Sequence, residues 1–123
     1  MKKTLLSAAL ALSASFAVPA DAGQCGHQYC WGAVAFDAIS GLYGYSSGYY
    51  SQGEAAGAAQ EGCGYNCREV KTFYNQCGAA AIGNNGGYGW GYGLSQYDAE
   101  SVAVSYCANY DFDCRVLVSS CSY

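Results

Sequence analysis

The chain has 123 residues, among them 17 Gly, 13 Tyr and 8 Cys, and its formal net charge at pH 7 is −4. This length allows one domain with a single hydrophobic core. Only 5 residues are Lys or Arg. Nucleic acids and anionic membrane surfaces are bound by clustered basic side chains, so we expect neither as a partner.

Residues 1–22 have the three parts of a secretory signal peptide. Lys2 and Lys3 form a positively charged start, an apolar run follows over residues 5–18, and a small-residue cleavage site ends at Ala22. The apolar run is shorter than the roughly 20 residues of a membrane-spanning helix, so we expect no stable membrane span. The mature protein is expected in the periplasm or the medium, exported through the general secretory route.

The mature chain contains an internal duplication, in which four blocks recur in the same order. The matched blocks are residues 31–35 with 77–81, 43–45 with 88–90, 51–55 with 95–99, and 67–70 with 114–117. We therefore divide the chain into the signal peptide, an N-terminal segment with a cysteine pair (23–30), and a duplicated domain (31–123). The two units of that domain are expected over residues 31–76 and 77–123.

Each unit predicts the order strand, strand, helix, strand. Ser51 and Ser95 are typical residues to begin a helix, because a serine hydroxyl can accept a hydrogen bond from a free N–H of the first turn. An acidic residue, Glu54 or Asp98, follows each serine by three positions and supports the same cap. Strands are expected over residues 32–36, 43–45 and 68–74 of the first unit and 78–82, 88–92 and 115–119 of the second.

These elements predict an α+β fold stapled by disulfides. Two tandem strand-strand-helix-strand repeats form an antiparallel sheet with two helices on one face, or two small abutting sheets. An even number of cysteines in a short exported chain indicates a disulfide framework in an oxidising compartment. The sequence leaves the connectivity open, but equivalent places in the two units favour the local pairs Cys63–Cys67 and Cys107–Cys114. Cys77 opens the second unit and Cys121 lies near the end of the chain, so we expect Cys77–Cys121 to pair across a sheet. Cys25–Cys30 is then the remaining pair and closes a small N-terminal loop.

The repeated blocks resemble an exported bacterial family labelled domain of unknown function 4189. The resemblance covers residues 31–121 and rests on both unit openings, the Tyr-Gly-Tyr and Tyr-Gly-Trp-Gly strands, the helices that end in cysteine, and the two Cys-Arg strand starts. It implies the fold and the export. Some mycobacterial members look like secreted effectors that act on host cells, and the family has no established catalytic residues to carry over.

The residues themselves predict no catalytic, metal or cofactor site. His27 is the only histidine, and it lies between Cys25 and Cys30, which we expect to be oxidised. The acidic residues Glu54 and Asp98 are explained by helix capping. A carboxylate pair for glycoside hydrolysis has no further support, so a small secreted hydrolase is the least favoured class.

Alternating aromatic residues are the strongest candidates for binding. Successive side chains of a strand point to opposite faces, so Tyr88, Trp90 and Tyr92 share one face and glycines share the other, as Tyr43 and Tyr45 do around Gly44. We favour a layout in which the aromatic residues form a core against the helices. In the other layout the helices pack on the glycines and the aromatic residues lie outside, where they form a binding surface.

The function that we expect is that of an exported, non-enzymatic interaction protein of the envelope or the medium, effector-like if it follows the mycobacterial members. Its partner would be another protein. The alternative is a cell-wall or glycan-binding module that uses the Tyr and Trp strands.

Overall fold

The computed structural model describes residues 23–123, and the expected signal peptide lies outside them. Its elements are β1 (Trp31–Phe36), β2 (Tyr43–Tyr49), α1 (Gln52–Cys63), β3 (Glu69–Tyr74), β4 (Gln76–Ile82), β5 (Tyr88–Gly93), α2 (Gln96–Cys107) and β6 (Arg115–Ser122). Both predicted caps are present, since the Ser51 and Ser95 hydroxyls accept hydrogen bonds from the third residue along. No helix among these residues has the length and apolar character that crossing a membrane requires.

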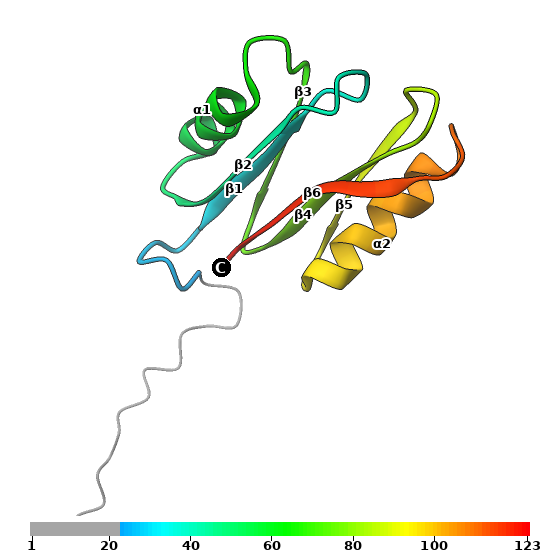
Figure 1. The fold of residues 1–123 in the computed structure, drawn as a ribbon. Coiled ribbons are helices and arrows are strands. Elements are labelled where there is room, and N and C mark those ends of the chain that lie inside the picture. The colour runs from blue at the N-terminus through cyan, green and yellow to red at the C-terminus, as the bar shows by residue number, and fades with distance from the viewer. Residues whose placement is uncertain (1–22) are drawn as a thin grey trace, which may run out of the picture.

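The strands form two antiparallel sheets, with the orders β2-β1-β3 and β5-β4-β6. In each sheet the first strand of the unit is central, and the helix connects the two outer strands. The two sheets face each other with one helix outside each (Figure 1). The α+β class with two repeated units is confirmed. Of the two expected arrangements the chain adopts the abutting sheets, with the helices on opposite outer faces of the pair.

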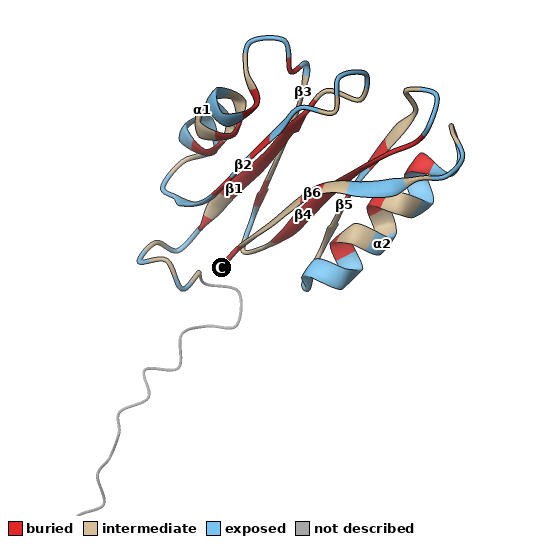
Figure 2. Ribbon diagram, in the orientation of Figure 1, coloured by how far each residue is buried: buried red, intermediate tan, exposed pale blue. Residues whose placement is uncertain are grey.

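The sequence of the central strands explains this arrangement. Strand β1 is buried on both faces: Ala33 and Ala35 pack on α1, while Val34 and Phe36 pack on the other sheet. Strand β4 repeats the pattern (Figure 2). Because successive side chains alternate between faces, each unit needs a helix on one face and a second sheet on the other. One sheet with both helices on one face would leave Val34 and Phe36 exposed to water.

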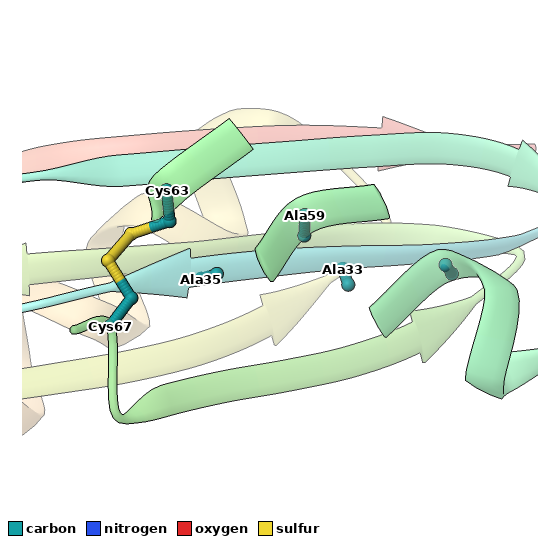
Figure 3. Close-up of a cluster of buried hydrophobic side chains, with 6 residues drawn as sticks. Ala33, Ala35, Ala59, Cys63 and Cys67 are labelled. Carbon is teal, nitrogen blue, oxygen red and sulfur yellow. A yellow bond between two sulfur atoms is a disulfide. The ribbon is translucent and has the colours of Figure 1, made fainter. Parts of the chain in front are cut away.

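The helices approach their sheets closely because both surfaces carry small side chains. Figure 3 shows Ala59 of α1 against Ala33 and Ala35 of β1, with the disulfide between Cys63 and Cys67 at the end of the helix. In the second unit α2 lies on the glycines of β5, and a Cβ atom at Gly89 would overlap backbone atoms of α2. The layout with an aromatic core against the helices is therefore wrong, because the helices pack on the glycine face.

Four disulfides link the described residues, and they are the four pairs expected from the sequence: Cys25–Cys30, Cys63–Cys67, Cys77–Cys121 and Cys107–Cys114. Two of them join the end of a helix to the start of the next strand at equivalent places in the two units. The Cys77–Cys121 bridge joins paired strands β4 and β6. Four disulfides in a domain of this size are typical of an oxidising compartment outside the cytoplasm.

Candidate functional site

A groove of about 830 Å³ runs along β5, on the side away from β4. Aromatic residues of β5 form one wall, and residues of α2 and of the turn after it form the other. The lining consists of Tyr88, Trp90, Tyr92, Val102, Tyr106 and Tyr110 together with glycines 86, 87, 89 and 91. The groove thus has an uncharged and mostly aromatic surface.

The facing sheet holds the aromatic side chains of β5 in place. The Tyr88 hydroxyl donates a hydrogen bond of 2.9 Å to Glu69 Oε1 of β3, and Lys71 Nζ lies 4.7 Å from the centre of the Trp90 ring. The same ammonium group is 3.4 Å from Glu69 Oε2. The hydrogen bond to Glu69, together with burial and the negative charge of Glu69, raises the pKa of Tyr88. Both the bond and the shift favour a neutral Tyr88 that donates its proton to Glu69.

Tyr92 and Trp90 differ in exposure. Tyr92 packs near Phe73 of β3, with ring centres 6.2 Å apart, and burial raises the pKa of its hydroxyl. Trp90 packs on Tyr92 at 5.2 Å but keeps 36% of its surface exposed. Trp90 is therefore the β5 side chain most accessible from the groove.

The backbone of β5 is open on the groove side. Gly83 N–H donates to Gly87 C=O at 2.8 Å in the hairpin between β4 and β5. Hydrogen-bonded and non-hydrogen-bonded pairs alternate along an antiparallel ladder, so the glycines of β5 bond to β4. The N–H and C=O groups of Tyr88, Trp90 and Tyr92 point away from β4, where β5 has no strand neighbour.

The other three sheet edges of the described domain carry features that discourage strand pairing. Strands β2 and β6 have register shifts against their neighbours, and β6 begins with Arg115. Strand β3 carries Glu69 and Lys71. Strand β5 has a regular register and contains no charged residue and no proline. It is the edge that accepts another strand most readily.

The first unit presents its aromatic residues differently. Tyr43 and Tyr45 of β2 are 49% and 62% exposed, but the helix positions equivalent to Val102 and Tyr106 are Ala58 and Gly62. Small residues there cannot form a second wall. The predicted binding residues are thus separated: Tyr88, Trp90 and Tyr92 line the groove, whereas Tyr43 and Tyr45 lie on β2 in the other sheet.

Sequence reasoning missed the wall formed by α2. Val102, Tyr106 and Tyr110 were not among the predicted binding residues, yet Tyr106 is 56% exposed and Tyr110 is 77% exposed. The sequence did contain an indication of this wall, because the large residues Val102 and Tyr106 of the second helix stand where the first helix has Ala58 and Gly62.

His27 packs edge-on against Tyr50, with ring centres 5.0 Å apart, and does not line the groove. Within residues 23–123, no three His, Cys, Asp or Glu side chains form a cluster suited to a metal ion.

Asp111 anchors the hairpin at one end of the groove. Its carboxylate accepts hydrogen bonds of 2.8 Å from the N–H groups of Asn85, Gly87 and Phe112. Desolvation acts to raise the pKa of Asp111, but the three N–H groups outweigh it and hold the pKa below the ordinary 3.8. The ionised carboxylate is therefore the form that holds the loop.

Acid is expected to loosen this hairpin. Because the pKa of Asp111 is lowered in the folded state, its stabilising contribution is present above pH 3.8 and is lost as the pH falls through the lowered pKa. Hydrogen exchange of the Gly87 amide, followed by NMR against pH, should show falling protection in that range. In Asp111→Asn this acid dependence should disappear; equal protection of Gly87 in acid and at neutral pH would contradict the prediction.

The fold and the groove define a class of protein. It is a small disulfide-bonded α+β domain of two strand-strand-helix-strand units, with an open aromatic edge in the second unit. The chain belongs to the family described as domain of unknown function DUF4189, whose profile matches residues 31–121. The chain is also similar to the NMR structure of Rv1813c from Mycobacterium tuberculosis, at 32% sequence identity and a TM-score of 0.57. That match covers 75% of this chain and 74% of the other. No curated protein matches the chain.

Proposed function

We propose that the protein is an exported, non-enzymatic interaction protein that binds an extended segment of another polypeptide along β5. The observation that carries the proposal is the coincidence of an open strand edge with an uncharged aromatic groove. An extended peptide can add to such an edge, where backbone hydrogen bonds supply affinity and the flanking side chains supply specificity. The signal-like residues 1–22 and the four disulfides support export.

The chemistry of the groove suits binding. Its lining is glycine, valine, tyrosine and tryptophan, so it offers neither a carboxylate nor an imidazole as a general base. Tyr and Trp combine a large contact area with few rotatable bonds, and they are enriched among the residues that dominate protein interfaces. These properties support an interaction protein over a hydrolase.

The alternative of a glycan-binding module has its own support. Trp90, Tyr106 and Tyr110 present partly exposed rings to the groove, and sugar faces stack on such rings. A glycan would use these rings but would not form a ladder with the N–H and C=O groups of β5. Amide protection along β5 therefore distinguishes the two functions.

The test uses the mature protein to capture proteins from periplasm, culture medium and host lysate, with peptidoglycan as a separate probe. Trp90→Ala is compared with Tyr45→Ala, which removes the equivalent ring of the first unit. We expect Trp90→Ala to lower the affinity for the captured protein at least about tenfold, while Tyr45→Ala leaves it unchanged. The captured protein should also slow exchange of the Tyr88, Trp90 and Tyr92 amides.

Two outcomes would reject strand addition. Equal capture by Trp90→Ala would place the binding surface elsewhere, provided that circular dichroism shows the variant to be folded. Retention on peptidoglycan that depends on Trp90, without amide protection along β5, would favour the glycan-binding module.

A further inference from the structure

We infer that the open edge of β5 also pairs with β5 of a second copy of this chain, in an antiparallel dimer with its twofold axis at Trp90. The inference rests on the proposed function, because it uses the same free edge and groove. It goes further because it names one occupant of the edge, a second copy of the same chain, which is present in any solution of the protein.

The sequence of this strand is a palindrome. Residues 87–93 read Gly-Tyr-Gly-Trp-Gly-Tyr-Gly in both directions. Two copies of a strand that pair antiparallel around Trp90 place Trp90 opposite Trp90 and Tyr88 opposite Tyr92. Every glycine then lies opposite a glycine. A twofold dimer interface requires one patch to complement itself, and this strand meets that requirement residue by residue.

The backbone supports the same register. Tyr88, Trp90 and Tyr92 direct their N–H and C=O groups outward, as the alternation from the Gly83–Gly87 hydrogen bond shows. With the axis at Trp90, outward residues meet outward residues at all three positions. Each of these residue pairs then exchanges two hydrogen bonds, and all the free groups of Tyr88, Trp90 and Tyr92 are satisfied. A register shifted by one residue would set outward groups against inward ones.

The side chains around the edge complete the fit. A twofold axis perpendicular to the sheet keeps equivalent faces on the same side, so the Val102 and Tyr106 walls of the two grooves meet across the paired strands. Cross-strand aromatic pairs stabilise antiparallel sheets. The lining of the groove is uncharged, so the net negative charge of the chain is not concentrated at the interface.

The other edge strands do not offer this self-pairing. Strand β2 reads Tyr-Gly-Tyr-Ser-Ser-Gly-Tyr and has a register shift opposite β1. Strand β3 carries Glu69 and Lys71, and β6 begins with Arg115. The twofold pairing is therefore specific to β5. A partner protein competes with the second copy for the edge, so dilution of the dimer favours partner binding.

The test measures the mass of the mature protein by analytical ultracentrifugation across a wide range of concentrations. We expect a reversible monomer–dimer equilibrium, with slower exchange of the Tyr88, Trp90 and Tyr92 amides in the dimer. Trp90→Lys places two like charges opposite each other at the axis, which is destabilising. It should weaken dimerisation at least about tenfold, whereas Tyr45→Lys on β2 should leave the equilibrium unchanged.

A charge exchange separates pairing from folding. Trp90→Lys and Trp90→Glu should each be monomeric alone and should form a mixed dimer when combined, because opposite charges then face each other at the axis. A variant with a damaged fold would not recover in this way. Circular dichroism of each variant checks the fold independently.

Several results would overturn self-pairing, and they differ from those that would overturn the proposed function. A single-chain mass at every concentration, or a dimer that Trp90→Lys leaves intact, rejects pairing at β5. If the protein stays monomeric while a captured partner protects the β5 amides, self-pairing fails and the proposed function stands. If neither a second copy nor a captured protein protects these amides, both fail.

Discussion

Replacing Phe73 with alanine is expected to lower the free energy of unfolding by about 4 kcal/mol, within the range for deleting a buried aromatic ring. Phe73 lies on β3 with 2% of its surface exposed, and it packs in the core between the two sheets with Val34 and Phe36. Gly32 and Gly78 leave space for its ring, since a Cβ atom at either position would overlap it. Its loss leaves a cavity that neither glycine can fill.

Urea denaturation followed by circular dichroism measures this effect under oxidising conditions. Phe112→Ala is the matched control, because Phe112 is 58% exposed and its truncation should change the free energy of unfolding by less than about 0.5 kcal/mol. A similar small effect for Phe73→Ala would contradict the packing of the two sheets around this ring.

Two identical changes from glycine to alanine are expected to have opposite effects. In Gly89→Ala the added methyl group would overlap backbone atoms at Ala103 and Cys107 of α2, which cannot move away as a flexible side chain can. Overpacking of this kind costs about 1–3 kcal/mol or more. We therefore expect Gly89→Ala to lower the free energy of unfolding by about 3 kcal/mol. The helix would have to shift away from β5.

In Gly57→Ala the methyl group meets no atom within 4 Å. Gly57 lies on the exposed side of α1, where alanine is favoured over glycine by about 1 kcal/mol. We expect this variant to be more stable than the parent by up to that amount. Thermal and urea denaturation of both variants provide the measurement, and a destabilised Gly57→Ala or a neutral Gly89→Ala would be inconsistent with the observed helix packing.

Local sequence patterns were sufficient for the elements and their caps. The duplication, both serine caps and the order of strands and helices follow from short-range residue patterns, because capping and strand alternation depend on neighbours only a few residues apart. The relation between the units was less accessible. The two sheets stack because both faces of β1 and β4 are apolar. The sequences of these short, alanine-rich strands do not show whether one face or both faces are buried.

The candidate site shows the same division. The sequence identified Tyr88, Trp90 and Tyr92, since their alternation with glycine is a local pattern. It did not identify Val102, Tyr106 and Tyr110, because the local sequence of a helix does not show which of its side chains lie beside an open strand edge. It also grouped Tyr43 and Tyr45 with the second-unit residues, although the fold places them in the other sheet.

The sequence by itself determined the duplicated α+β organisation, the helix starts and the cysteine places, because repeats, caps and spacing are local. Tertiary structure alone decided that the helices cover the glycine faces, that the sheets stack, and that β5 keeps an uncharged open edge. Those features arise from which surfaces meet and which remain without a neighbour, and surface contacts depend on residues far apart in the chain.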